Sequence, residues 1–486
     1  MSEFKTKTLL GFKWSFLNKF VTQGLQFVFS IILARLLSPA DFGMFAMIAV
    51  FSNLGLLFSD FGFGHALIYK KHSSKIEFDS VFVINLLIGL LLTLLFFLIA
   101  PFIANFYDEP RLNNLSKAIS ILFFIQSFGL VSIIEIKKKI DFKRLAVIDS
   151  VSLLFSSIIA ITFAIYGFGI WSLVIRSILN ITIRTVIVFF FSSYQPKFNF
   201  NIKVIKNLWK YSISVSANGF LTYWMRNLDN LMIGKLIGQQ SLGFYNMAYQ
   251  IMLLPMNNIS NVVKDVLFPS FSSIKNDINV IRPVYLKIIQ TIALFTFPML
   301  AGLACLSDSF VIIILGEKWA PMIPILSLLA LVAIPQSIFT VNGTIFLNTG
   351  RPDIPLKINT ISLPFYAIGF YLGLKIDGII GLVYAYIIIN LILIIPSYYL
   401  SAKNINLKFK DFIKVLWPVI LATSFMSMII LLVKTNIHNL PKTLSFVLLI
   451  FVGALAYALI LFFLKKRIKL YQLILNSPIK LSNETD

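Results

Sequence analysis

The sequence predicts an all-α polytopic membrane protein with about 14 transmembrane helices, and three observations support this fold class. Of the 486 residues, 58% are apolar and only 13% are charged, whereas an ordinary soluble domain has roughly 25% charged residues. The apolar residues come in blocks of about 20, which as helices match a hydrocarbon layer roughly 30 Å thick. Runs such as 86–99 and 444–464 do not alternate in polarity, as the strands of a membrane β-barrel would.

The individual helices follow from hydrophobic runs that end at charged or turn residues. The first block begins near Phe12, is too long for a signal-peptide core and lacks a small-residue cleavage site, so we expect it to be retained. Pro321 and Pro324 interrupt the apolar pattern at the start of the tenth block. In order, the expected helices cover residues 12–36, 41–68, 80–104, 115–136, 145–166, 169–192, 208–236, 243–267, 284–307, 320–347, 356–376, 378–401, 412–433 and 443–464.

The distribution of Lys and Arg supports this helix count. Counted alternately, the loops on one side are rich in basic residues, as in 137–144 and 465–469, and those on the other side hold few, such as Arg35 and Lys235. Cytoplasmic loops carry the Lys and Arg excess, and an odd error in the count would scramble the asymmetry. We therefore expect both termini to be cytoplasmic. Membrane topology also explains the formal net charge of +22 better than nucleic-acid binding does.

An internal repeat divides the chain. The pattern RLL…FG at residues 35–43 recurs as KLI…LG at 235–243, and GIWSLV at 169–174 resembles GIIGLV at 378–383. These echoes predict an N-terminal six-helix half at 1–196, a C-terminal six-helix half at 197–405, and two additional helices with a basic cytoplasmic tail at 406–486. Because six is even, the halves share one orientation and are expected to enclose a cavity around an axis along the membrane normal.

The segments 34–43, ARLLSPADFG, and 60–64, DFGFG, carry a resemblance to a known family. They resemble the Wzx-type polysaccharide exporters, including colanic-acid and teichuronic-acid exporter relatives, of the multidrug/oligosaccharidyl-lipid/polysaccharide superfamily. The resemblance implies a flippase in the bacterial inner membrane that moves an undecaprenyl-pyrophosphate-linked oligosaccharide from the cytoplasmic to the outer leaflet. It also implies the bilayer, a polysaccharide polymerase and chain-length machinery as partners. It identifies neither the sugar nor any binding residue.

Four basic residues inside expected helices are candidates for a cationic, substrate-binding cavity. A carrier of a pyrophosphate-linked glycan needs such groups, because a bare phosphate in an apolar wall is costly. The candidates are Lys19, Arg176, Arg184 and Arg226. The structural alternatives are that Lys19 and Arg184 extend to the cytoplasmic interface, and that Arg226 pairs with Asp229 one turn along its helix.

Asp60 and Asp229 are the candidates for ion coupling, because a buried carboxyl can bind and release a proton. The coupling ion, proton or sodium, stays open. Polar residues on the first and seventh helices, including Asn18, Asn227 and Asn230, line a hydrated cavity or bond neighbouring helices.

The remaining motifs indicate no cofactor and no metal. The chain has no Walker-type phosphate loop, its one cysteine cannot form an internal disulfide, and its three histidines lack metal-ligand spacing. Every expected outer loop is short and no pair of histidines has acid/base spacing, which argues against a glycan polymerase or ligase, so we do not expect an enzyme. The alternatives that stay open are a multidrug or small-molecule exporter of the same superfamily and a lipid II flippase. The two C-terminal helices favour the oligosaccharide branch.

Overall fold

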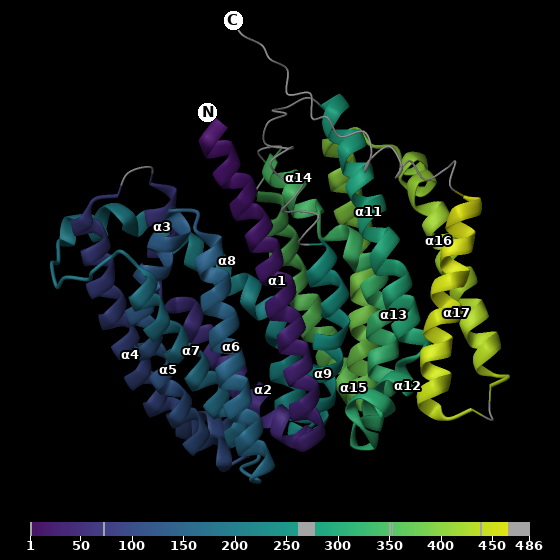
Figure 1. Ribbon diagram of the computed structural model, residues 1–486, viewed down its shortest axis with the longest axis horizontal. Helices are drawn as coiled ribbons and strands as arrows, with labels where there is room; N and C mark the ends of the chain where they lie inside the picture. Colours follow the sequence, from purple (N-terminus) through teal and green to yellow (C-terminus); the bar gives the residue numbers. More distant parts are fainter. Residues whose placement is uncertain are drawn as a thin grey trace, which may run out of the picture. The chain divides into compact units, whose positions relative to one another are not determined.

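The structure is a computed structural model that describes residues 2–70, 73–260, 278–348, 351, 353–437 and 440–464. All regular secondary structure in this part of the chain is helical (Figure 1). Ten of the described helices are long and apolar enough to cross a membrane. The all-α polytopic class is therefore confirmed, whereas the exact number of fourteen spans stays a prediction.

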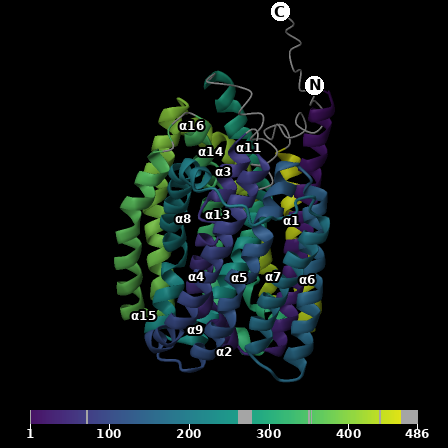
Figure 2. The same ribbon diagram turned by 90° about the vertical axis from the view of Figure 1, so that its left-hand side faces the viewer.

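The chain forms two compact units. Unit 1 comprises Met1–Ile251, Ile314–Ile325 and Pro355–Ile389; unit 2 comprises Met252–Ile313, Leu326–Ile354 and Asn390–Asp486. Unit 1 begins with nine helices: α1 (Ser2–Leu36), α2 (Pro39–Phe58), α3 (Phe63–Tyr69), α4 (Lys75–Tyr107), α5 (Arg111–Lys138), α6 (Phe142–Ile165), α7 (Trp171–Phe191), α8 (Ile202–Leu236) and most of α9 (Gln239–Pro255). Helix α4 packs along α5, α5 along α7, and α6 packs against both α1 and α7 (Figures 1 and 2).

The second predicted helix, 41–68, is interrupted. A capping box between Ser38 and Asp41 starts α2, with Pro39 at its first position, as helix N-termini favour. The chain then turns between α2 and α3, where Phe61 and Gly62 have φ of +46° and +77°. A Cβ on Gly62 would lie 2.5 Å from the carbonyl oxygen of Ser212. Glycine therefore allows both the left-handed turn and the close approach of α8.

The predicted helices 356–376 and 378–401 meet at the boundary that the sequence predicts. Helix α15 (Asp353–Asn404) is non-helical at Asp377 and Gly378, so that residues 353–376 and 379–404 are separate helical arms. At this hairpin the arms approach closely, because a Cβ on Gly381 would lie 2.1 Å from the carbonyl oxygen of Gly373. The predicted helix 320–347 is instead divided into a 3₁₀ turn (Glu317–Met322), α13 (Ile323–Phe339) and α14 (Asn342–Asn348).

Unit 2 is built around α11 (Ile278–Cys305), α16 (Phe409–Lys434) and α17 (Lys442–Phe463), with α12 (Ser307–Phe310) and the short helix Met256–Ser260. The division between the units falls within a further short helix, Val311–Leu315. Helix α16 packs between α11 and α17. The core joins Ile292 and Phe297 of α11 to Ile338 and Val419. The expected eighth helix, 243–267, runs past Ser260 into residues outside the described part.

Candidate transport site

Arg184 is paired with a carboxylate on the neighbouring helix. Its Nε on α7 lies 2.8 Å from Oδ1 of Asp149 on α6, and Asn18 Nδ2 of α1 donates to Asp149 Oδ2 at 3.3 Å. Three helices thus meet at one carboxylate, which neutralises the guanidinium. A paired charge is far less costly in a membrane-spanning helix than a free one. The side chain of Lys19, the next residue of α1, lies outside the described part.

Arg176 is situated differently, although it lies on the same helix. Its Nε donates to Ser157 Oγ of α6 at 3.1 Å. Within the described residues, no carboxylate lies within ion-pairing distance of the half-buried Arg176 side chain. The described residues thus leave the guanidinium with free donors and without a neutralising carboxylate, which is an arrangement that can bind a phosphate group.

Arg226 and Asp229 share α8 but do not form an ion pair in the described structure. Asp229 is 4% exposed. Its Oδ2 accepts from the Tyr245 hydroxyl of α9 at 2.7 Å, and its Oδ1 accepts from the backbone N–H of Asn230 at 2.7 Å. The Arg226 side chain is exposed. The ion pair between Arg226 and Asp229, which the sequence left open as an alternative, is therefore absent from the described residues.

A polar and aromatic cluster surrounds Asp229. Asn246 Nδ2 donates to Asn230 Oδ1 at 3.4 Å, linking α9 to α8. The Tyr245 ring stacks on Tyr249, which in turn meets Tyr386 of α15 edge-on, with ring centroids 5.9 and 6.3 Å apart. The polar residues expected on the seventh helix therefore take part in interhelical bonds here. Asn227 is different, since its Nδ2 donates to the Tyr223 carbonyl of its own helix.

Asp60 stabilises the turn between α2 and α3. Both of its carboxylate oxygens accept from the backbone N–H of Gly64, at 3.0 and 2.9 Å, and Asn85 Nδ2 of α4 approaches Oδ1 at 3.4 Å. The Oδ1 of the fully buried Asn85 has no described hydrogen-bond partner. The half-buried Asp60 carboxyl is thus a loop anchor that lies beside an amide oxygen without a partner among the described residues.

Asp79, which is 1% exposed near the start of α4, was not among the candidate residues predicted from the sequence. Its Oδ1 accepts from the Tyr194 hydroxyl at 2.7 Å and from the backbone N–H of Lys197 at 3.2 Å, and Asn199 Nδ2 lies 3.4 Å from Oδ2. Burial and this bond raise the pKa of the Tyr194 hydroxyl, so it remains a donor. The available signal was an acidic residue just before an apolar run, which indicates a helix start but not its distant partners.

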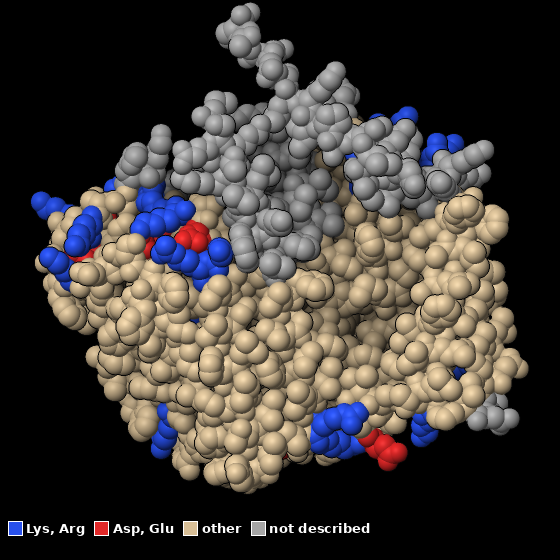
Figure 3. All heavy atoms as spheres, viewed as in Figure 1, with Lys and Arg blue, Asp and Glu red and all other residues tan. Residues whose placement is uncertain are grey.

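Two sets of contacts made by lysines lie at opposite ends of unit 1, because one is near the start of α5 at Arg111 and the other is at its end, Lys138. At the first end, Lys235 Nζ lies 2.7 Å from Asp108. Lys138 at the second end donates to the carbonyls of Leu67 and Lys70 at 2.9 and 2.8 Å, closing the C-terminus of α3. Basic residues gather along the upper left edge and a wide band without charges lies below them (Figure 3).

The segment 316–319, which precedes the interruption at Pro321 and Pro324, closes the end of α1. Trp319 is fully buried and donates through Nε1 to the Ala34 carbonyl at 2.9 Å. Lys318 Nζ donates to the carbonyls of Arg35 and Leu37, at 2.8 and 2.6 Å. These donors satisfy carbonyls that the last turn of a helix leaves free.

Comparisons with solved structures show the fold. The lipid II flippase MurJ in an inward closed conformation superposes with a TM-score of 0.75 at 17% identity, covering 96% of this chain and 99% of that one. An inward-facing multidrug resistance MATE family transporter of the MOP superfamily has a TM-score of 0.65 at 14% identity, covering 79% of this chain and 94% of that one.

Sequence comparisons identify the family. The lipopolysaccharide biosynthesis protein WzxC of Escherichia coli (strain K12) is 26% identical and covers 85% of each chain. The teichuronic acid biosynthesis protein TuaB of Bacillus subtilis (strain 168) is 26% identical, covering 94% of this chain and 95% of the relative. Residues 32–324 match the family described as polysaccharide biosynthesis protein. The resemblance expected from residues 34–43 and 60–64 is confirmed, and the chain belongs to the polysaccharide biosynthesis protein family.

Proposed function

We propose that this protein is a flippase that moves an undecaprenyl-pyrophosphate-linked oligosaccharide repeat unit from the cytoplasmic to the outer leaflet by alternating access. One observation carries the proposal. A chain of the polysaccharide biosynthesis family has, over 96% of its length, the fold of a lipid II flippase. The fold supports transport of a lipid-linked sugar, and the family supports a role in polysaccharide biosynthesis. The MATE-like fold alone would suit a multidrug exporter equally well.

The proposed substrate contacts are the four intramembrane cations, in a definite order. Arg176 and Arg226 come first, because neither has a carboxylate within ion-pairing distance in the described residues. Arg184 comes after them, since Asp149 already neutralises it. Lys19 completes the proposed cationic cavity. A planar guanidinium binds two phosphate oxygens at once, which suits a pyrophosphate.

The proposed coupling sites are Asp229 and Asp60. Asp229 supports the proposal because, among the described residues, its buried carboxylate accepts hydrogen bonds from neutral groups, namely a tyrosine hydroxyl and a backbone N–H. A charged carboxylate in such surroundings favours taking up a proton or a cation. Binding there would compete with the Tyr245 bond that joins α8 to α9, which links ion binding to helix packing.

The proposed arrangement has both termini in the cytoplasm of a bacterial cell with the protein in its inner membrane, two six-helix halves at 1–196 and 197–405, and two additional helices in 406–486. The Lys and Arg asymmetry supports this orientation. A polysaccharide polymerase and chain-length machinery are the proposed partners. The proposed action is transport without catalysis.

Deletion of the gene tests the function. The expected result is loss of the surface polymer, with lipid-linked repeat units accumulating in the cytoplasmic leaflet. Complementation by the intact gene should restore the polymer. An intact polymer together with a lost drug-resistance phenotype would instead assign the multidrug function. Arrest of cell-wall synthesis with accumulation of lipid II would assign the lipid II function, which the MurJ-like fold keeps in consideration.

A further inference from the structure

The connection between α7 and α8 is held against α4 although it has no regular structure of its own over residues 192–201. Asp79 accepts bonds from three groups in this connection, as described above. Ser80, the next residue of α4, accepts at Oγ from the backbone N–H of Asn201 at 3.0 Å. We call residues 194–209, which include the first two turns of α8, the strap. Its position is fixed at both ends of its irregular part.

One face of the strap packs into the protein. Tyr194, Ile205 and Leu208 are buried in a cluster with Phe63 of α3 and Phe82 of α4. These contacts, together with the Asp79 bonds, fix which side of the strap faces outward.

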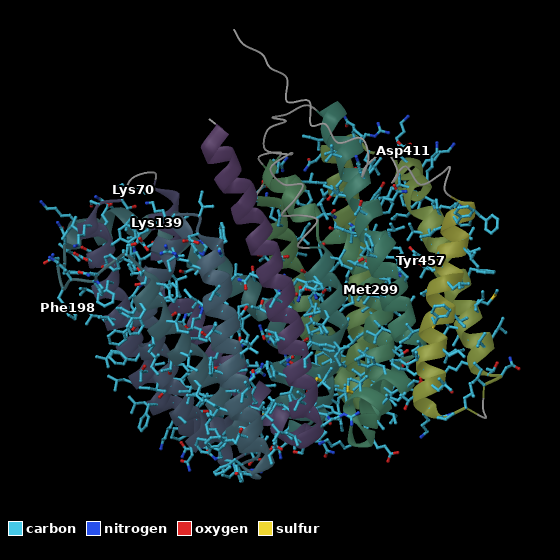
Figure 4. All side chains as sticks on the ribbon, in the orientation of Figure 1. Lys70, Lys139, Phe198, Met299, Asp411 and Tyr457 are labelled. Carbon is cyan, nitrogen blue, oxygen red and sulfur yellow. The ribbon has the colours of Figure 1, made fainter. Side chains whose placement is uncertain are left out.

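The outward face combines large apolar side chains with lysines. Phe198 is 81% exposed, and Phe200, Ile202 and Trp209 are also exposed. Phe198 projects from the left edge of the helices in Figure 4. The lysines of the strap, Lys197, Lys203 and Lys206, are exposed as well. The strap contains no Asp or Glu, so its three lysines have no acidic partner within it.

This combination does not suit water or hydrocarbon. In water, Phe198 and its apolar neighbours would stay hydrated at a cost. In hydrocarbon, the irregular backbone and the three ammonium groups would lose their hydrogen-bonding partners. The headgroup layer satisfies both, because aromatic rings enter the upper acyl chains while lysines extend toward phosphates. Net positive charge specifies anionic headgroups.

We propose that the strap is a membrane-surface anchor whose aromatic side chains lie at the headgroup boundary and whose Lys197, Lys203 and Lys206 bind anionic phospholipid headgroups. The anchor fixes the connection between the two proposed halves at a constant depth, with Asp79 holding it to the N-terminal half. The proposal is independent of which substrate the protein transports.

The single cysteine of the chain makes the depth measurable. In the full-length Cys305→Ser protein, Phe198→Cys is labelled with an environment-sensitive fluorophore and reconstituted into phosphatidylcholine vesicles with 30% phosphatidylglycerol. We expect nitroxides high on the acyl chain to quench the label more strongly than nitroxides near the bilayer centre. Aqueous iodide should quench weakly. Strong iodide quenching without lipid quenching would overturn the proposal. It is also the result expected if another protein normally covers the strap, because the strap would then face water in these vesicles.

The headgroup preference is measured with the strap lysines intact. Quenching by nitroxide-labelled phosphatidylglycerol should exceed that by nitroxide-labelled phosphatidylcholine, with an enrichment of at least about fivefold, the factor for one lysine near an anionic surface. Lys197→Glu/Lys203→Glu/Lys206→Glu should abolish this preference. The matched control, Lys408→Glu/Lys410→Glu/Lys414→Glu in and before α16, should leave it unchanged. Equal quenching by the two lipids in the protein with its natural lysines would overturn the anionic assignment without the need for any charge variant.

Discussion

Gly43 of α2 and Gly243 of α9 pack against each other reciprocally. A Cβ on Gly43 would lie 1.6 Å from the carbonyl oxygen of Gln239, and a Cβ on Gly243 would lie 1.9 Å from that of Pro39. Each glycine thus meets the carbonyl four residues before the other. Two equivalent elements related by a local two-fold axis produce such a contact. The contact supports the proposed repeat, since both glycines occupy the same position in the pattern at 35–43 and 235–243.

Gly43→Ala and Gly243→Ala should each destabilise the protein. The added methyl group meets backbone rather than a flexible side chain, so the helices must move apart, at a cost of about 1–3 kcal/mol. Thermal unfolding in detergent should show a lower Tm for both variants. Gly24→Ala in α1 is the matched control, because nothing lies within 4 Å of its Cβ position, and its Tm should stay the same or rise slightly. Equal Tm values for all three variants would contradict the close crossing.

Arg226→Ala should reduce flipping at least about tenfold without loss of stability, which corresponds to about 1.4 kcal/mol of substrate binding. Arg226→Lys should retain part of the activity, since the charge survives but the planar fork is lost. Because Asp229 bonds Tyr245 rather than Arg226, Arg226→Ala/Asp229→Ala should not recover activity. Flipping is measured with lipid-linked oligosaccharide in vesicles, and Arg111→Ala serves as an exposed control. Normal flipping by the double variant at natural expression would refute the substrate role.

The Arg184 and Asp149 side chains should show coupling in a double-mutant cycle. Removing either partner leaves a charge unpaired, whereas removing both does not. Since the two side chains are 35% and 28% exposed, solvent screening limits the expected coupling to about 1 kcal/mol. The measurement is thermal unfolding of Arg184→Ala, Asp149→Ala and the double variant. Strictly additive losses would show that the pair does not contribute.

Asp79→Ala should destabilise the protein by about 2–4 kcal/mol, because it removes bonds to a charged acceptor and leaves the buried Tyr194 hydroxyl without one. Asp79→Asn should lose less, since its amide oxygen still accepts from Tyr194. Proteolysis in the 195–201 connection should be faster for Asp79→Ala than for Asp79→Asn. The decrease in Tm should also be larger for Asp79→Ala. Ser80→Ala is the control, because it removes only one of the bonds to the strap, together with a bond from the hydroxyl to the Ile76 carbonyl of its own helix, and it should cost about 1 kcal/mol. An Asp79→Ala protein that resists proteolysis as well as the natural chain would argue against the strap.

Cysteines placed in the loop 137–144 should react only with reagents that reach the cytoplasm, and cysteines in 107–114 only with external reagents. The Cys305→Ser background makes each new thiol the single one in the chain. Lys138 and Asp108 lie at opposite ends of unit 1, so the two loops must be labelled from opposite sides. External labelling of the basic loop would invert the proposed orientation.

Several candidate site residues could be located from the sequence, but their interaction partners on other helices could not. The sequence identified Arg184 as an intramembrane cation because an ionisable residue stands out in an apolar run. It could not reveal that Asp149, on a different helix, neutralises it. For Asp229 the sequence suggested the nearest cation, Arg226, because residues three apart share a helix face. The structure instead pairs Asp229 with Tyr245, since the packing of α8 against α9 determines which groups meet.

The sequence by itself determined the all-α membrane class, the family and most helix positions, because the lengths of apolar runs and their punctuation by charge are properties of consecutive residues. It also located the boundary at Asp377 and Gly378. Only the tertiary structure decided that Asp79 accepts a hydrogen bond from Tyr194, 115 positions away in the sequence. It also decided that α2 and α9 approach each other closely at Gly43 and Gly243. The physical reason is that hydrogen-bond partners and close backbone contacts depend on distances between helices, and a single sequence does not encode these distances in any local pattern.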